Sequence, residues 1–554
     1  MKKYLVKISF VLGIVVASLT FSAFSETSYF EISKNLDIFS TLFRELNIYY
    51  VDDADPGELM KTGIDAMLES LDPYTNYIPE SQMEDYKMMT TGQYGGIGAL
   101  IQTRGDKVII SEPYEGFGAD KAGLRAGDKI IAVDGKSAIG KNSEEIREFL
   151  LGQPGTTVEL TVERPGEEKT ITKVVTREEV KIKDVPYHSM MRNDVGYIRL
   201  TGFTSSASAE VKAALNELKE KGAKAIVLDI RGNGGGLLTE SVNIVNFFVD
   251  RGTPVVSTKG KIKDWDKDYK ALNAPIDMEI PLAVLINSGS ASASEIVSGS
   301  LQDNDRAVII GTNSFGKGLV QNVRPLSYNS KLKVTVAKYY TPSGRCIQKL
   351  DYSHKNEDGK AEEIPDSLIS EFKTLHSKRP VFDGKGISPD LKVRGLPLSD
   401  ITAVLIMKNL VFDFATEYRI KHETIAPAKD FKLTNDEYED FVHFLSDKDY
   451  EYKTESENLL EDLEKAAKED KYFDDVKAEY QALKDKLHYN KKDDLYKFKD
   501  EIKQILEGEI VSRYYYQTGQ VEISMRNDPV LDEAIETLTN KEKYTSILAG
   551  TYKK

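Results

Sequence analysis

The region from residue 181 to residue 395 repeats an order of buried strand and amphipathic helix, and this order limits its possible folds most strongly. Unbroken apolar runs occur at AIVLDI (225–230), LAVLI (282–286) and AVIIG (307–311), with helical patterns between them. Runs of this kind are typical of strands covered by helices on both faces, because a strand with one face in water alternates apolar and polar residues. Residues 181–395 are therefore predicted to form a layered α/β domain.

The chain has 554 residues, which is too long for one hydrophobic core. Three other regions differ from residues 181–395 in their pattern of apolar, polar and charged residues. Residues 26–91 contain two helical patterns and are predicted to be an N-terminal helical segment. Residues 92–180 carry short β-runs between Gly, Asp and Pro, with one helix that Asn142 caps, and are predicted to form a compact sandwich or barrel. Residues 396–554 are rich in charged helical segments and are predicted to be a solvated helical appendage.

The N-terminus has the pattern of an export signal. Lysines precede an apolar run over residues 8–24, and the small residues Ala23 and Ser25 stand before a predicted cleavage point at Glu26. An uncleaved membrane anchor is the alternative, since the run approaches the length of about 17 residues that spans a bilayer. We expect residues 1–25 to be a signal peptide and the protein to be exported, either periplasmic or anchored and facing the periplasm.

Charge and cysteine content exclude several classes of protein. The formal net charge of −15 argues against a general nucleic-acid binder, because such proteins need a basic surface. The single cysteine, Cys346, cannot form an internal disulfide, so stability must come from hydrophobic cores. We expect neither a metal ion nor a cofactor, and the sequence leaves the oligomeric state open.

Three segments that each follow a predicted buried strand carry residue types suited to catalysis. They are RGNGGGLL (231–238), NSGSASASEI (287–296) and GTNSFGKG (311–318). The glycines let backbone N–H groups approach a substrate oxygen, and serines at the start of a helix lie near N–H groups that favour negative charge. Reactive groups in open α/β sheets collect at the carboxyl ends of strands, so these segments are predicted to form one site.

Lys317, between two glycines, is a candidate general base. An ordinary lysine titrates near about 10.4, and lowering its pKa to about 7.5 requires destabilising the charged form by roughly 4 kcal/mol, which burial can supply. A neutral lysine can take the proton of a serine hydroxyl. Each segment alone also fits a structural role: a serine helix cap, a solvated lysine in a glycine turn, or a tight strand-to-helix turn.

Taken together, the motifs resemble one family. LDIRGNGGGL, GSASASEI, FGKGLVQ and YYTPSGRCIQ occur in this order, preceded by LESLDPYTNYI and by YGGIGALI with AGLRAGDKIIAVDG, which is similar to a PDZ domain. The set resembles the carboxyl-terminal processing peptidases, also called tail-specific proteases, over about residues 35–395. The resemblance implies a multidomain α/β protein, with a crotonase-like peptidase core and an inserted PDZ domain. It also implies a serine endopeptidase that works through an acyl-enzyme.

The resemblance assigns roles to catalytic residues. Ser292 is implied as the nucleophile and Lys317, 25 residues later, as the base. Gln321 is implied to orient the amine, although four residues of extended strand cover about 13 Å and a bend, for instance at Gly318, would be needed. One departure is Thr312, which stands where relatives carry an acidic residue. This departure leaves the details of that loop open, but it does not affect the assignment of the Ser292/Lys317 dyad.

The resemblance also assigns binding groups. The oxyanion donors are implied to be the backbone N–H of Ala293 and that of Gly235, with Gly236 as the alternative. In the PDZ-like unit a substrate C-terminus would add as an extra strand at the sheet edge. The implied contacts are Gly95, Gly96, Ile97 and Gly98 for the carboxylate, and Ile101 and Ile146 for the terminal apolar side chain. Expected partners are polypeptides with apolar C-termini and an adaptor protein; the alternative for this unit is a regulatory lid or scaffold.

Other classes of function fit parts of the sequence. GTNSFGK matches a phosphate-binding loop, but Gly318 replaces the Mg²⁺-binding Ser or Thr, and GLVQNVRPL is predicted to be extended rather than helical. A non-catalytic PDZ scaffold with a degenerate peptidase fold is the second alternative, which the intact Ser292, Lys317 and Gln321 disfavour. A histidine-based triad is disfavoured because all six histidines lie outside the three motif segments.

Overall fold

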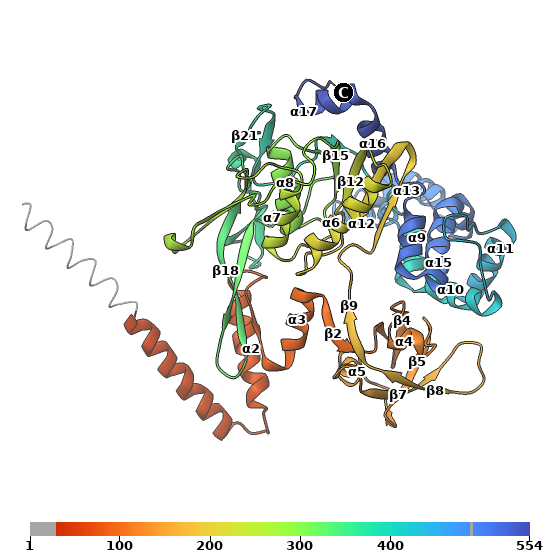
Figure 1. The fold of residues 1–554 in the computed structure, drawn as a ribbon. Helices are drawn as coiled ribbons and strands as arrows, with labels where there is room; N and C mark the ends of the chain where they lie inside the picture. Colours follow the sequence, from red (N-terminus) through yellow and green to blue (C-terminus); the bar gives the residue numbers. More distant parts are fainter. Residues whose placement is uncertain (1–28, 488–490, 554) are drawn as a thin grey trace, which may run out of the picture. The chain divides into compact units, whose positions relative to one another are not determined.

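The computed structural model of the protein describes residues 29–487 and 491–553 (Figure 1). The chain divides into two units, Met1–Tyr77 and Ile78–Lys554, which are described separately. The predicted signal peptide, residues 1–25, lies outside the described residues. Within the described ranges, none of the helices has both the length and the apolar character needed to cross a bilayer.

The first unit is helical over most of its described part. Residues 29–49 form one helix, and α2 (Pro56–Glu69) follows after a short loop. Asp55 caps α2, since its Oδ1 accepts hydrogen bonds from the N–H groups of Gly57 and Glu58 at 2.7 and 3.0 Å. Pro56 occupies the first turn, where its missing N–H costs no hydrogen bond.

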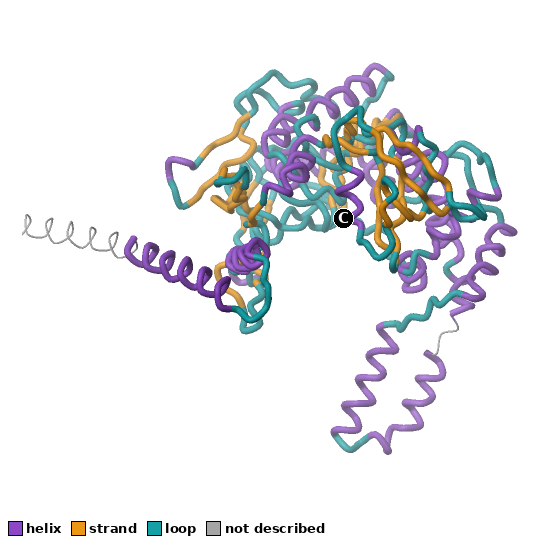
Figure 2. The backbone as a smooth tube through the Cα atoms, turned by 90° about the horizontal axis from the view of Figure 1, so that it is seen from below, coloured by secondary structure: helices purple, strands orange, loops and turns teal. Residues whose placement is uncertain are grey.

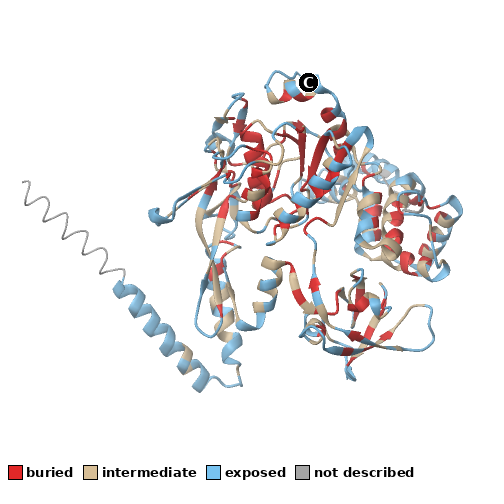
Figure 3. Cartoon of the chain, viewed as in Figure 1, coloured by how far each residue is buried: buried red, intermediate tan, exposed pale blue. Residues whose placement is uncertain are grey.

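A six-stranded sheet forms the centre of the second unit, in the order β10-β11-β12-β15-β16-β23. All neighbouring pairs are parallel except β10 with β11. The strands are β10 (Tyr187–Met190), β11 (Val195–Arg199), β12 (Ala225–Asp229), β15 (Leu282–Ile286), β16 (Val308–Gly311) and β23 (Leu391–Lys392). Every residue of β12, β15 and β16 is buried (Figure 3), which confirms the layered α/β prediction.

Two different sets of helices cover the two faces of this sheet. On one face, α6 (Ala207–Glu220), α7 (Leu238–Asn246) and α8 (Ala293–Asp303) share a core cluster with Ile226 and Leu228. On the other face, α16 (Pro529–Thr539) and α17 (Lys541–Leu548) pack against alternate residues of the same strands. The prediction that residues 396–554 are a solvated appendage is therefore wrong for their last part. The apolar face of α16 supplies part of a core that the central sheet does not complete alone.

The remaining C-terminal helices form a domain with its own core. It is built from α9 (Asp400–Met407), α10 (Leu410–Lys421), α11 (Asn435–Phe444) and α15 (Lys499–Ser524). The pair α12 (Glu455–Glu469) and α13 (Phe473–Leu487) lies side by side and exposes most of its surface (Figure 2).

A second sheet, in the order β3-β4-β5-β7-β8, forms the PDZ-like unit with β6 paired to β5. Its elements are β3 (Ala99–Arg104), β4 (Lys107–Pro113), β5 (Lys129–Val133), β6 (Lys136–Ser137), β7 (Thr157–Glu163), β8 (Ile171–Thr176), α4 (Gly118–Lys121) and α5 (Ser143–Leu150). The predicted capping box is confirmed: Asn142 Oδ1 accepts from the N–H groups of Glu144 and Glu145, and Glu145 accepts from Asn142 N–H. Strands β2 (Gln93–Gly96) and β9 (Glu178–Lys181) pair where the chain enters and leaves this unit.

A long hairpin follows β16 in the chain. Strands β17 (Leu319–Pro325) and β18 (Lys331–Tyr340) pair antiparallel, and β18 also pairs with β13 (Pro254–Gly260). The segment GLVQNVRPL is thus extended, as predicted, so the preceding glycine loop lacks the helix that a phosphate-binding loop requires.

Candidate active site

The three predicted catalytic segments meet at one edge of the central sheet. Strands β12, β15 and β16 are adjacent and parallel, and each runs directly into one of the segments. Gly232 N–H donates to Asn287 Oδ1 at 2.8 Å, and Phe315 N–H donates to Ser290 O at 3.0 Å. These bonds join the first segment to the second and the second to the third, so the structure brings the three segments together, while their catalytic roles stay predictions.

Glu295 is the residue that ties the nucleophile turn to the lysine loop. Its Oε2 accepts from Ser292 N–H at 2.8 Å and from Lys317 N–H at 2.9 Å. Its Oε1 accepts from Gly316 N–H at 2.7 Å and from Ser314 Oγ at 2.5 Å. The side chain is fully buried. One carboxylate oxygen thus holds the main chains of Ser292 and Lys317 next to each other.

The environment of Glu295 has opposing electrostatic effects. Burial raises the pKa of its carboxyl group above the ordinary value, while the four donors favour the ionised form. The same burial raises the pKa of Tyr339, whose hydroxyl group, lying near Glu295, therefore stays protonated. Tyr339 Oη donates to the carbonyl oxygen of Ser292 at 3.3 Å, and its N–H donates to Gly318 O at 2.9 Å. Strand β18 thereby supports both the serine turn and the lysine loop.

Ser292 has a strained backbone. Its φ and ψ angles are 55° and −111°, a conformation that non-glycine residues rarely adopt. Such strain costs about 1–3 kcal/mol and persists only where surrounding contacts impose it. Here the bonds to Glu295 and Tyr339 impose it, and they place Ser292 at the sharp turn from β15 into α8. Ser292 itself is half-buried, at a sharp strand-to-helix turn of the kind that suits a nucleophile.

The predicted oxyanion segment, residues 231–238, lies directly against the predicted nucleophile Ser292. A Cβ atom on Gly235 would lie 2.9 Å from Ser292 Cβ and 3.0 Å from Ala293 N, so only glycine fits at this position. Asn233 braces the segment, because its carbonyl oxygen accepts from Ala291 N–H at 3.0 Å. Its side-chain Oδ1 accepts from Gly235 N–H at 2.9 Å. The implied donors are thus brought together, but Gly235 N–H must leave Asn233 Oδ1 before it can serve an oxyanion.

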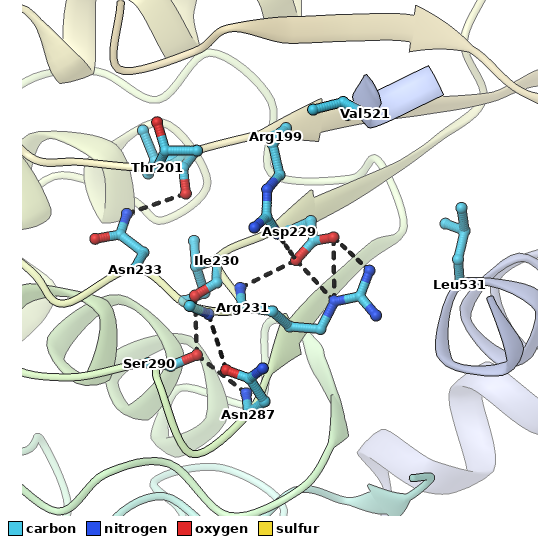
Figure 4. A network of polar contacts seen from close by, with 12 residues as sticks. Arg199, Thr201, Asp229, Ile230, Arg231, Asn233, Asn287, Ser290, Val521 and Leu531 are labelled. Atoms are coloured by element: carbon cyan, nitrogen blue, oxygen red, sulfur yellow. Dashed lines mark hydrogen bonds and ion pairs between the residues drawn. The ribbon is translucent and has the colours of Figure 1, made fainter. Parts of the chain in front are cut away.

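A cluster of charged groups holds the start of the oxyanion segment (Figure 4). Asp229, fully buried at the end of β12, lies between Arg199 and Arg231, with closest N···O distances of 2.8 and 2.6 Å. Tyr197 Oη donates to the same carboxylate at 2.8 Å. Burial acts to raise the pKa of Asp229, but the two guanidinium groups outweigh it and the pKa lies below its usual value.

Gly316 is needed for close packing of the lysine loop. Its φ is 90°, and a Cβ atom there would lie 2.4 Å from Lys349 Cβ. We expect Gly316→Ala to lower the free energy of unfolding by about 2–4 kcal/mol and to reduce the predicted peptidase activity strongly, because the loop that carries Lys317 must move. Chemical denaturation and a peptide-cleavage assay measure the two effects.

The matched control for this prediction is Gly252→Ala. Gly252 also has a φ of 90°, but no atom lies within 4 Å of the added Cβ. It therefore suffers the conformational strain without the clash. Equal losses in the two variants would show that the close approach at Gly316 is unimportant.

Other predicted site residues have different surroundings. Gln321 lies on β17, where its Nε2 donates to Thr335 Oγ1 at 3.2 Å; its contact with the Lys317 amine stays a prediction. Gly95 and Gly96 pair with β9, while Ile97 and Gly98 lead into β3. Ile146 is 1% exposed and Ile101 is half-buried, and both pack in the core of the PDZ-like unit. Their contacts with a peptide also stay predictions.

Several residues of this site were not predicted. Glu295 falls within the quoted motif SASASEI, and Asp229 within LDIRGNGGG, yet their bonds join segments that are distant in sequence. Tyr339 is the first residue of the quoted motif YYTPSGRCIQ, whereas Asp528 lies outside all of the quoted motifs. A buried acidic residue inside an otherwise small or apolar segment was the only available signal, since such a residue needs partners.

Comparison with known proteins gives a consistent result. Residues 194–353 match Peptidase family S41, residues 109–164 match a PDZ domain, and residues 401–538 match the family "Probable PDZ-protease, C-terminal helical domain". The carboxy-terminal-processing protease of Bartonella bacilliformis is 38% identical over 348 residues, which are 62% of this chain and 80% of that protein. A probable CtpA-like serine protease of Staphylococcus aureus is 38% identical over 317 residues, 56% of this chain and 62% of that protein.

Among solved structures, the photosystem II D1 C-terminal processing protease is 31% identical and covers 64% of this chain and 92% of its own, with a TM-score of 0.34. The PDZ domain of a carboxy-terminal protease from Vibrio cholerae, solved with a peptide, is 27% identical and covers 16% and 99%, with a TM-score of 0.16. Because both TM-scores are low, the assignment depends on the sequence matches. The chain belongs to peptidase family S41, the serine-type carboxy-terminal-processing peptidases, and combines the peptidase region with a PDZ domain and a C-terminal helical domain.

Proposed function

We propose that this protein is an exported endopeptidase that binds substrate C-termini through its PDZ domain and cleaves peptide bonds with a Ser292/Lys317 dyad. The observation that carries this proposal is the shared hydrogen-bond acceptor, since Glu295 Oε2 binds the N–H groups of both dyad residues. A degenerate scaffold would have no need to hold these two residues together behind a strained turn.

The proposed reaction has two halves. Neutral Lys317 accepts the proton of Ser292 Oγ, which attacks the substrate carbonyl carbon, and the negative charge formed on the carbonyl oxygen is stabilised by backbone N–H groups. As the first residue of α8, Ala293 has an N–H without an acceptor inside the helix. The protonated lysine then gives its proton to the leaving amine. Water, deprotonated by the same lysine, hydrolyses the acyl-enzyme ester.

The PDZ domain supports recognition of C-termini. Strand β3 is an outer strand of its sheet, so a peptide can pair with its open edge. Helix α5 flanks this strand, and Ser143 N–H donates to Thr103 Oγ1 of β3 at 2.8 Å. Helix α5 therefore lies next to the strand at whose open edge a peptide would add. The PDZ domain of the V. cholerae protease was likewise solved with a peptide.

A pair of peptides that differ only at the C-terminus tests the recognition. We expect a fluorogenic peptide with a free apolar C-terminus to be cleaved with a kcat/KM about 10–100-fold higher than its C-terminal amide. The reason is that backbone N–H groups bind a carboxylate through charge-assisted hydrogen bonds worth about 1.5–3 kcal/mol. Acetylation of the N-terminus should have little effect and serves as the control. Equal kcat/KM values for acid and amide would contradict C-terminal recognition.

Export is supported by the sequence pattern of residues 1–25. N-terminal sequencing of the protein purified from its own cells tests it, and we expect the mature chain to begin at Glu26. A chain that retains Met1 and is recovered with the membrane fraction would favour the anchored alternative.

A further inference from the structure

The C-terminal helical domain, taken as the matched residues 401–538 and so including the start of α16, contacts the oxyanion segment through Asp528. This residue precedes α16, and its Oδ1 accepts from the N–H groups of Val530 and Leu531 at 2.9 and 3.2 Å, so it caps the helix. Its Oδ2 is directed elsewhere and accepts from Arg231 Nη2 at 2.6 Å. One carboxylate thus joins the start of a C-terminal helix to the first residue of the oxyanion segment.

The bond between Asp528 and Arg231 is well shielded. The Arg231 side chain is 19% exposed and that of Asp528 11%. Together with Arg199 and Asp229, they form a cluster of two guanidinium groups and two carboxylates. The charges balance only when Asp528 is present. Without it, Asp229 alone would face two partly buried positive charges, and Arg231 would lose one of its two anionic partners.

Helix α16 holds Asp528 in a fixed place. Its apolar residues pack on the sheet face that also contains Val227 of β12 and Leu285 of β15. The residues on the helix are Val530, Leu531, Ala534, Ile535 and Leu538. The helix that carries Asp528 is therefore docked on the same two strands that lead into the oxyanion and nucleophile segments. A carboxylate on such a support can determine the position of a neighbouring guanidinium group.

A change at Arg231 would be transmitted to the oxyanion donors. The next residue, Gly232, donates to Asn287 Oδ1 at 2.8 Å, and a Cβ atom on Gly289 would lie 2.8 Å from Gly232 Cα. Asn233 follows and braces Ala291 next to the nucleophile. Gly235, two residues further on, has no room for a Cβ atom beside Ser292, so a shift of the segment would change the position of Gly235 relative to Ser292.

We propose that Asp528 is a positioning residue for the peptidase reaction: by fixing Arg231, it holds the oxyanion segment against the nucleophile, so the C-terminal helical domain completes the active site. This role rests on the proposed serine peptidase function. It also explains why this domain follows the peptidase region in the same chain, since the peptidase core alone lacks the second carboxylate.

The test uses two substitutions that keep the helix cap and remove the ion pair. Asn and Ser are both good N-cap residues, so Asp528→Asn and Asp528→Ser should retain α16 while Arg231 loses its partner. In the full-length protein we expect kcat to fall about 10–100-fold. We expect the affinity for a peptide aldehyde, whose adduct with the nucleophile presents an oxyanion, to fall by a similar factor. Binding of a peptide that occupies only the PDZ domain should be unchanged.

The control is Asn540→Ala. Asn540 caps α17, and α17 packs on the same sheet face as α16. Among the described residues, Asn540 has no hydrogen bond to Arg231. It should lower the melting temperature and leave kcat unchanged. An equal loss of kcat in Asn540→Ala and in Asp528→Asn would show that Asp528 contributes only to stability, and it would overturn the proposal. Unchanged kcat and unchanged aldehyde affinity in both Asp528 variants would also overturn it.

Hydrogen exchange separates this inference from the proposed function. We expect the backbone amides of residues 232–236 to exchange faster in Asp528→Asn than in the wild type, whether or not a substrate has been found. Unchanged exchange in this segment would overturn the positioning role. A wild-type protein that cleaves no peptide would instead count against the proposed function, and loss of cleavage in Ser292→Ala with normal cleavage in Asp528→Asn would count against the inference alone.

Discussion

Replacing Ser292 by alanine is expected to lower kcat for peptide cleavage by at least about 1,000-fold, with little change in stability. The attacking oxygen is lost, and what remains is binding and oxyanion stabilisation. Relief of the strain at φ 55° is not expected, because alanine has the same Cβ atom. The measurement is the rate of hydrolysis of a fluorogenic peptide at saturating concentration.

Lys317→Ala should cause a loss of similar size, and the double variant should be no worse than either single variant. Two groups that act in one proton transfer are strongly non-additive, because removing either one stops the step. Ser327→Ala, at an exposed turn between β17 and β18, is the matched control. Full activity in Ser292→Ala or in Lys317→Ala would refute the dyad.

Among the proposed substitutions, Glu295→Ala is expected to have the second largest effect. It should lower both the stability of the protein and its activity. It removes the acceptor of three backbone N–H groups and one hydroxyl group at a fully buried position. Each unsatisfied buried donor costs about 1–3 kcal/mol, so we expect the free energy of unfolding to fall by roughly 3–5 kcal/mol after partial relaxation. Activity should be lost because Ser292 and Lys317 are no longer held together.

Glu295→Gln gives a sharper version of this experiment. The side chain keeps its shape, but its NH₂ group replaces one oxygen and meets N–H donors instead of accepting from them. We expect a smaller loss of stability, of about 1–3 kcal/mol, with kcat still reduced at least about 100-fold. Glu220→Gln, at the exposed end of α6, is the control. A Glu295→Gln enzyme with normal kcat would show that the carboxylate does not position the dyad.

The sequence was most informative where one local pattern suffices. The apolar runs at 225–230, 282–286 and 307–311 became β12, β15 and β16, because residues buried on both faces of a strand must all be apolar. The capping box at Asn142 could also be predicted from a local pattern, because its partners lie within three residues of Asn142.

The sequence was misleading where a helix is partly charged. Residues 529–548 carry many acidic and basic side chains, which favoured a solvated appendage, yet α16 and α17 cover one face of the central sheet. An amphipathic pattern shows that a helix has an apolar face but not which surface that face will meet. That choice depends on the whole chain.

By itself, the sequence determined which three segments carry the candidate catalytic groups: a glycine segment, a serine turn and a lysine loop. It also showed that each of them follows a buried strand. Only the tertiary structure decided how these segments are held. Glu295 joins Ser292 to Lys317. Asp528 binds Arg231, although the two residues are 297 positions apart in the sequence. The physical reason is that a buried carboxylate is stable only where several donors converge on it, and that convergence arises from packing rather than from local sequence.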